Sequence, residues 1–208
     1  MKPLLYFSPR SCSRVPLTAL EEIGQPFETR LVALSKGEHR KPDFLAITPS
    51  GKVPALMTDD GLITQNGAIL FYLAETYPEA RLLPIRSTAA GRAHLLSMML
   101  RCSSDLHPLV TRFAKPELIS GEAANASQIR QQADEMLRMQ LRQIDELLQK
   151  QEWYLEEGWS ILDAYVAWIW FRITDAGFDP GGFTALSAHF TKSSQRPSSL
   201  AALAREQT

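Results

Sequence analysis

The sequence lacks most of the features that mark secreted, membrane-bound or metal-binding proteins. Its 208 residues include only two cysteines, Cys12 and Cys102, which are far apart. They form no Cys-x-x-Cys or metal-ligand pattern with the four histidines. No apolar run approaches the roughly 20 residues of a membrane helix, and the apolar stretch at the N-terminus is too short for a signal peptide. We therefore expect a cytoplasmic protein with no metal and no structural disulfide.

Charge excludes further classes of partner. The 22 Lys and Arg residues nearly balance the 23 Asp and Glu residues, so the formal net charge is -1. There is no polybasic tract, so neither nucleic acid nor a membrane surface is an expected partner. Hydrophobic residues make up 45% of the chain. This composition describes a globular protein with one large domain or two smaller ones around a substantial core.

The first part of the chain alternates strand and helix patterns. Compact apolar runs predict strands at residues 4–7, 27–32, 53–57 and 62–64. A helix ending at Gly24 and a second helix that Gln65 or Asn66 can cap lie between and after them. The turn signal Asp59-Asp60-Gly61 predicts a hairpin between the last two strands. Residues 1–78 therefore predict a small α/β domain with a four-stranded mixed sheet.

The rest of the chain has helical periodicity only. Residues 79–87 contain a proline and no clear period, which is typical of a linker, and residues 88–208 predict an all-helical domain. A long helix over 88–115 should kink or break near His107, because Pro108 follows. A loop is expected at 121–127 and a second long helix at 127–151. Ser160 and Asp163 form a capping box that opens a buried helix over 161–175, and short helices are expected at 183–190 and 198–205.

Cys12 is placed at a helix N-terminus, because Pro16 is tolerated only in a first helical turn. Free amides and the helix dipole there favour the thiolate, and Arg10 and Arg14 act in the same direction. The alternative is a small buried residue in a tight turn, and position alone leaves both open. Cys102 lies within a long helix and is expected to be structural.

Pro54 stands where a central strand needs an amide donor. A cis Val53–Pro54 bond would resolve this and would leave the amide and carbonyl of Val53 free to pair with an extended peptide ligand. An ordinary proline that opens a strand is the commoner case, since only about one X-Pro bond in twenty is cis. Both alternatives remain open at this point.

Five motifs, in order along about 160 residues, resemble the cytosolic glutathione transferases, most closely their bacterial Beta class. They are Tyr6-Phe7-Ser8-Pro9 with Cys12-Ser13, Gly51-Lys52-Val53-Pro54-Ala55-Leu56, Ala68-Ile69 with Tyr72-Leu73, Ser103-Ser104-Asp105-Leu106-His107, and Trp159-Ser160 with Asp163-Ala164-Tyr165. The resemblance implies a thioredoxin-like domain that holds glutathione as co-substrate, a helical domain that contributes to the second-substrate wall, and a homodimer with a role in detoxification.

The resemblance also implies site residues. Cys12 would face the glutathione sulfur and His107 would project toward it, as the catalytic pair. The residues that would bind glutathione are Ser11, Lys36, Lys52, Val53, Pro54, Gln65 and Asn66, with Lys36 at the glycyl carboxylate. The second-substrate pocket would be lined by Pro9, Arg10, Leu109, Arg112, Phe113 and Trp168, and the two arginines suggest an anionic group on the electrophile.

The chain departs from the family pattern at two positions. Gln65 stands where the family has an acid that pairs with the γ-glutamyl ammonium, so the bond loses its charge and about half its strength. Asn66 could still bind the γ-glutamyl carboxylate at the helix N-terminus. Leu100 stands where Beta-class chains often have an Asn that reaches the glutathione of the partner subunit, so that contact is expected to be lost.

The implied activity is glutathione transfer to small electrophiles, or thiol transfer to mixed disulfides through Cys12. Val15 stands where a resolving cysteine would be needed, which excludes a dithiol cycle. The alternative is a non-catalytic binding module in which Gln65 and Leu100 mark lost glutathione chemistry.

Overall fold

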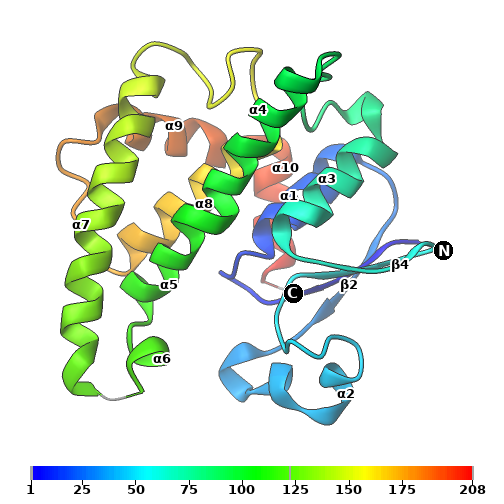
Figure 1. Ribbon diagram of the computed structural model, residues 1–208. Coiled ribbons are helices and arrows are strands. Elements are labelled where there is room, and N and C mark those ends of the chain that lie inside the picture. Colours follow the sequence, from blue (N-terminus) through cyan, green and yellow to red (C-terminus); the bar gives the residue numbers. More distant parts are fainter. Residues whose placement is uncertain (1, 122, 208) are drawn as a thin grey trace. The chain divides into compact units, whose positions relative to one another are not determined.

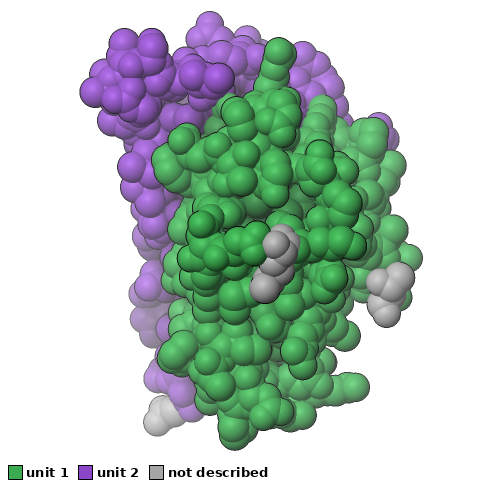
Figure 2. Space-filling model, turned by 90° about the vertical axis from the view of Figure 1, so that its right-hand side faces the viewer, with its two compact units in different colours: residues 1–83, 196–208 green, residues 84–195 purple. Residues whose placement is uncertain are grey.

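The computed structural model describes residues 2–121 and 123–207 (Figure 1). The chain divides into two compact units, which Figure 2 distinguishes by colour. Unit 1 comprises residues 1–83 and 196–208, and unit 2 comprises residues 84–195. The division after residue 83 lies within the segment 79–87 that the sequence predicts as a linker, although η3 (Pro78–Ala80) and the buried Leu82 belong to unit 1.

Unit 1 is built on a four-stranded mixed sheet, as predicted. Its strands are β1 (Leu4–Phe7), β2 (Glu28–Leu31), β3 (Ala55–Thr58) and β4 (Gly61–Thr64), in the order β2-β1-β3-β4. Strand β1 pairs in parallel with β2 and antiparallel with β3, and β3 and β4 form the predicted hairpin. The parallel pair is joined by the helix α1 (Arg14–Ile23), which ends at Gly24 in the left-handed conformation.

The two central strands, β1 and β3, are largely buried, whereas β2 is mostly exposed. On one face Tyr6 of β1 packs against Phe44, whose ring centroid lies 5.9 Å away, in a cluster with Val32, Val53 and Ala55. Phe44 belongs to α2 (Pro42–Leu45), which follows the short 3₁₀ turns η1 (Leu34–Lys36) and η2 (Glu38–Arg40). Helix α1 packs against α3 (Asn66–Thr76), as Figure 1 shows. Residue alternation along β1 turns Leu5, which is fully buried, to the face opposite Tyr6.

Helix α10 (Pro197–Arg205) packs on α1 and so belongs to unit 1, although the sequence predicted a helical domain that continues to residue 208. Three ion pairs join the α10 segment to α1, and they explain the difference. They are Arg14–Glu206, Arg196–Glu22 and Arg205–Glu21. Charged side chains on α1 therefore contribute to the packing of α10 against α1. Hydrophobic periodicity alone could not reveal this contact.

Unit 2 is entirely helical. Its elements are α4 (Ala89–Leu100), the π-helical segment η4 (Arg101–Leu106), α5 (His107–Ala114), α6 (Glu117–Ser120), α7 (Ala123–Leu148), α8 (Ile161–Asp175) and α9 (Thr184–Ser194). The helix predicted to kink or break near His107 does not break: its backbone stays helical through the π-helical segment η4 into α5, which carries Pro108 in its first turn. No helix among the described residues is both long and apolar enough to cross a membrane.

The predicted loop at 121–127 is wrong for most of its length. Helix α7 already begins at Ala123, and Glu122 lies outside the described residues. Three alanines at positions 123, 124 and 126 explain the early start, because alanine has the highest intrinsic helix propensity.

The predicted capping box at the start of α8 is confirmed. The Ser160 side chain accepts a hydrogen bond from the first turn of the helix, and the Asp163 carboxylate accepts one from the Ser160 amide at 2.8 Å. Asp163 also accepts from the Tyr154 amide at 2.7 Å and contacts His189 Nε2 at 2.8 Å. Nearly every side chain from Ile161 to Trp170 is buried, so α8 is the core helix of unit 2.

Candidate active site

Cys12 lies in a tight turn that the hydroxyls of Ser11 and Ser13 and the backbone of Ser8 hold together. The Ser8 amide donates to the Ser13 hydroxyl at 3.0 Å, and the Ser11 hydroxyl donates to the Ser8 carbonyl at 2.7 Å. The hydroxyls of Ser11 and Ser13 are 2.6 Å apart. Arg10, at the tip of this turn, has a φ of +64°, which L-residues other than Asn and Asp rarely adopt. The turn places Cys12 one residue before Ser13, the N-cap of α1.

Two contacts connect Cys12 to other segments of unit 1. Its thiol donates to the Val53 carbonyl, with sulfur and oxygen 3.5 Å apart. Its own carbonyl accepts from the side-chain amide of Asn66 at 3.0 Å. Cys12 is therefore fixed between the segment before β3 and the first turn of α3, which are the two segments that the sequence assigns to glutathione binding.

The expected thiolate at Cys12 is not supported. Burial raises the pKa of the thiol from 9.0 to about 12, although the residue as a whole is only half-buried. The bond to Val53 acts in the same direction, because only the protonated thiol can donate it. A hydrogen bond from the backbone amide of Cys12 and the charge of Lys52 lower the pKa, but less than burial raises it.

The structure explains why the helix terminus does not stabilise the thiolate. The amides of Ser13, Arg14 and Val15 are already bonded within the turn, at 3.2, 3.1 and 3.2 Å. The Arg14 guanidinium forms two bonds to the Glu206 carboxylate, at 2.9 and 2.6 Å, which neutralises the charge that we expected to act on the sulfur. Sequence reasoning missed both effects, since neither the serine network nor Glu206 was assigned a role.

Val53 has the backbone geometry of a peptide-binding residue. The Val53–Pro54 bond is cis, so the less common of the two alternatives is the one present. Its carbonyl accepts the Cys12 thiol, and within the described parts of the chain its amide has no hydrogen-bond acceptor. Val53 precedes β3 by two residues and lies outside the strand pairing. Its amide and carbonyl can therefore pair with an extended backbone.

Gln65 and Asn66 have different environments. Gln65 is exposed at the N-cap of α3 with a φ of +73°, and its side chain makes no capping bond. Asn66 is 5% exposed, and its amide nitrogen is used by the Cys12 carbonyl. Its side-chain oxygen is buried without a partner among the described residues. An oxygen can only accept, so that atom of Asn66 does not suit the carboxylate that we expected it to bind.

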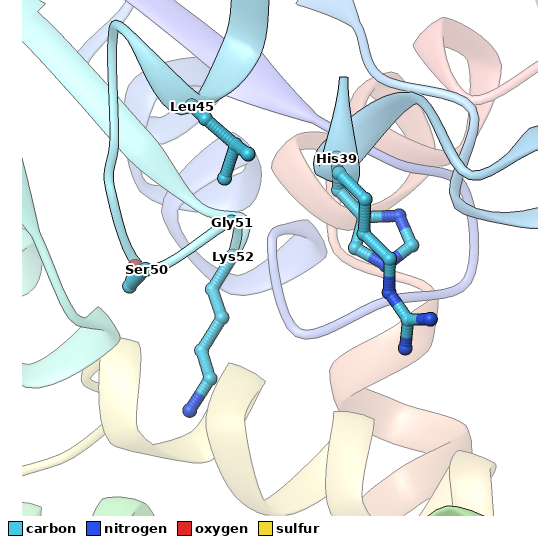
Figure 3. A pocket seen from close by; sticks show the side chains of 6 residues that line it. His39, Leu45, Ser50, Gly51 and Lys52 are labelled. Atoms are coloured by element: carbon cyan, nitrogen blue, oxygen red, sulfur yellow. The ribbon is translucent and has the colours of Figure 1, made fainter. Parts of the chain in front are cut away.

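Unit 1 also contains a hollow of about 300 Å³ lined by His39, Arg40, Leu45, Ser50, Gly51 and Lys52, which we name the His39 hollow (Figure 3). Gly51 has a φ of +59°, and a Cβ there would lie 2.7 Å from the His39 carbonyl oxygen. Only glycine lets these two segments approach so closely. Sequence reasoning identified Lys52 but missed His39 and Arg40. Lys36, which it predicted at the glycyl carboxylate, is exposed on η1 and is not among the lining residues.

His107 is the first residue of α5 in unit 2. Its Nδ1 lies 2.8 Å from the hydroxyl of Tyr165, and its ring meets Trp168 edge to face, with centroids 4.7 Å apart. Tyr165 is fully buried and Trp168 is 5% exposed, so two side chains of the core helix α8 hold the imidazole. These contacts fix the orientation of the half-buried His107 imidazole, whose ring nitrogens can donate or accept a proton.

Three of the predicted second-substrate residues are buried within unit 2. Phe113 is 2% exposed, with the Arg130 guanidinium 3.9 Å from its ring centroid and Phe178 packed against its edge. Leu109 and Trp168 are 3% and 5% exposed. The apolar stripe of α5 faces the core of unit 2, so Phe113 and Leu109 expose little surface in this chain. Arg112 is exposed on the other face of α5, and in unit 1 Pro9 is half-buried and Arg10 exposed.

Cys102 is structural in its surroundings, as expected. It is fully buried in η4, and burial raises the pKa of its thiol to about 12. Both thiols are free. No group of three or more His, Cys, Asp or Glu side chains within the described part of the chain is arranged to hold a metal ion.

Comparison with known proteins agrees with this site. Residues 2–75 match the family model of the glutathione S-transferase N-terminal domain. Glutathione S-transferase GST-4.5 of Xanthomonas campestris is 31% identical over 188 residues, which cover 90% of this chain and 91% of that protein.

Solved structures extend the similarity to both units. A bacterial Beta-class glutathione S-transferase of Sphingomonas chungbukensis is 33% identical with a TM-score of 0.84, over 98% of each chain. A sphingomonad glutathione S-transferase in complex with glutathione is 32% identical with a TM-score of 0.85, also over 98% of each chain. The chain belongs to the glutathione S-transferase family.

Proposed function

We propose that the protein transfers glutathione to small electrophiles, and that Cys12 assists as a neutral hydrogen-bond donor. The observation that carries this proposal is the Val53 carbonyl 3.5 Å from the Cys12 sulfur. A cysteinyl residue paired in an extended conformation with Val53 would bring its own sulfur beside that thiol. The amide of that cysteinyl residue would donate to the Val53 carbonyl in place of the Cys12 thiol. The Cys12 S–H would then be able to donate to the glutathione sulfur.

The protonation state of Cys12 favours conjugation over disulfide exchange. A thiol with a pKa near 12 carries little thiolate at neutral pH, and only the thiolate attacks a disulfide. A neutral thiol can instead stabilise the thiolate of glutathione by a hydrogen bond. In the transfer step that thiolate uses a sulfur lone pair to form the carbon–sulfur bond, and the leaving group departs with the electrons of its bond to carbon.

The other assignments follow from the same site. We place Val53 and Lys52 at the peptide backbone of glutathione, and Gln65 at its γ-glutamyl end. His107 of unit 2, oriented by Tyr165, would act on the reacting sulfur. Arg10 and Arg112, both exposed, would favour an electrophile with an anionic group.

The test combines calorimetric titration with glutathione and a conjugation assay with an activated aryl chloride, on wild type, Cys12→Ser and Cys12→Ala. Serine keeps a neutral donor whereas alanine removes it. We expect Cys12→Ser to keep most of the conjugation rate and Cys12→Ala to lose about tenfold, the value of one hydrogen bond to a charged group.

Three outcomes separate the alternatives. If both variants lose conjugation equally, Cys12 is not a hydrogen-bond donor. If both keep conjugation but lose exchange with a mixed disulfide, the protein is a thiol transferase through Cys12. If glutathione produces no binding heat and no conjugation in wild type, the chain is a non-catalytic member of the family.

We further propose a cytoplasmic homodimer with a role in detoxification. Two free thiols support a reducing compartment. Apolar side chains that remain exposed in the single chain support a second subunit: Phe71 on α3 is 53% exposed, and Leu96 and Leu100 on α4 are 49% and 47% exposed. Light scattering on the purified protein would report the mass of one chain if this proposal is wrong.

A further inference from the structure

The His39 hollow is positively charged and lacks a neutralising partner. Arg40 and Lys52 line it, and no acidic residue does. Within residues 2–121 and 123–207, neither of them takes part in an ion pair. The nearest acid in sequence, Glu38, instead accepts the Ala33 amide at 2.8 Å. The hollow therefore has charge available for an anionic ligand.

A polar atom at this site also lacks a partner. Nδ1 of His39 is buried and has no hydrogen-bond partner among the described residues. A buried polar atom without a hydrogen-bond partner is unfavourable. The unpaired atom belongs to a residue that lines the hollow, and it is independent of the charge of Arg40 and Lys52.

The size and shape of the hollow exceed what a glycyl carboxylate needs. Its volume of about 300 Å³ corresponds to about ten water molecules. Leu45 contributes an apolar wall, and Figure 3 shows it above Gly51, from where the Lys52 side chain runs downward past the hollow. A side chain with methylene groups that end in a carboxylate would place its methylenes against Leu45 and its charge at Arg40.

We propose that the His39 hollow selects the C-terminal residue of the thiol peptide and accepts a glutamate there in place of glycine, with Arg40 as the residue that reads the added carboxylate. This inference rests on the proposed function, because the peptide backbone must first pair with Val53. His39 and Lys52 would hold the terminal carboxylate, which every such peptide carries. Arg40 would distinguish a second carboxylate from a neutral group of equal size.

The test compares three peptides by calorimetric titration of the full chain: glutathione, γ-Glu-Cys-Glu and γ-Glu-Cys-Gln. The last two have the same shape at the C-terminal residue and differ in charge. We expect γ-Glu-Cys-Glu to bind at least fivefold more tightly than γ-Glu-Cys-Gln to wild type. In Arg40→Gln this ratio should fall to near one.

Lys41→Gln is the matched control, because it removes one positive charge from the next residue, which is exposed and does not line the hollow. It should preserve the fivefold ratio. The inference is overturned if glutathione binds but the two larger peptides bind equally or not at all, or if Arg40→Gln leaves the ratio intact. Failure of all three peptides to bind would overturn the proposed function together with this inference.

Discussion

The backbone amides at the N-termini of α1 and α8 find their hydrogen-bond acceptors in different ways. At α8, Ser160 caps the helix in the usual manner and Asp163 accepts hydrogen bonds from two backbone amides. At α1, the side chain of the N-cap residue Ser13 makes no capping bond and turns back to the Ser8 amide. The first arrangement serves the stability of unit 2. The second holds a turn in which Cys12 is the reactive group.

This difference shows that a helix N-terminus does not by itself activate a cysteine. The amides that would stabilise a thiolate are used by the turn that positions Cys12. Fixing the position of the sulfur and lowering its pKa therefore compete for the same donors. In this protein the amides fix the position of the Cys12 sulfur, and the pKa of its thiol is not lowered.

Asp163→Ala should show the largest effect. The substitution leaves the buried Tyr154 and Ser160 amides without acceptors and removes the partner of the buried His189. We expect a loss of about 3–5 kcal/mol in the free energy of unfolding. Denaturant unfolding measures it, with Asp134→Ala on the surface of α7 as the control. A loss below about 1 kcal/mol would mean that the two caps do not differ as described.

We expect the next largest effect in the rate at which Cys12 is alkylated at different pH values. With a pKa of about 12, the rate with iodoacetamide should keep rising from pH 9 to 11, and at pH 8 it should be at least a hundredfold below that of an unperturbed thiol. Mass mapping separates Cys12 from Cys102. A rate that levels off below pH 9 would show that the helix terminus does activate the sulfur.

The same shift has a defined sign for stability. The folded pKa of Cys12 lies above the unfolded value, so the folded state keeps its proton at pH values where the unfolded state has lost it. This stabilising contribution is fully present below pH 9 and is lost progressively between pH 9 and 12. Cys12→Ser, compared with wild type by denaturant unfolding at pH 8 and pH 10, should remove the part of this dependence that Cys12 causes, while the raised pKa of Cys102 still contributes.

Ser13→Ala should cost less than Asp163→Ala, because it removes one acceptor from one buried amide, that of Ser8. We expect a loss of about 1–3 kcal/mol and a faster alkylation of Cys12 as the turn loosens. Ser35→Ala, on an exposed turn, is the control. Unchanged stability and alkylation would show that the serine network does not hold the cysteine.

Arg10→Gly should show the smallest effect, in the stabilising direction. Relief of the positive φ is worth about 1–2 kcal/mol, and the greater chain entropy of glycine offsets part of it. We expect a gain of about 0.5–1 kcal/mol, whereas Arg10→Ala should give none. A loss with glycine would show that contacts of the Arg10 side chain outweigh the backbone conformation.

Much of the fold could be predicted because local patterns and long-range packing agree. The hairpin at Asp60-Gly61 and the capping box at Ser160 are set by neighbouring residues, and the structure contains both. The place of α10 could not be predicted, since it depends on charges more than 170 residues apart, such as Arg196 and Glu22.

The site was predictable in its positions but not in its chemistry. The sequence placed Cys12, Val53 and Asn66 in the right segments, and the structure brings them together. The pKa of Cys12 depends on which amides and charges are already bonded, and no local pattern contains that information. The His39 hollow was missed because His39 and Arg40 lie in an irregular segment, where periodicity gives no signal of which side chains converge.

The place of α10 has a consequence for the order in which the protein is made. A ribosome synthesises residues 84–195 after the sheet of unit 1 and before the helix that completes it. Until Arg205 and Glu206 emerge, Glu21 and Arg14 on α1 have no partners on α10, and the helix that follows Cys12 lacks its cover. The unit that begins first is therefore finished last, because a nascent chain stalled before residue 196 still lacks the helix that covers α1.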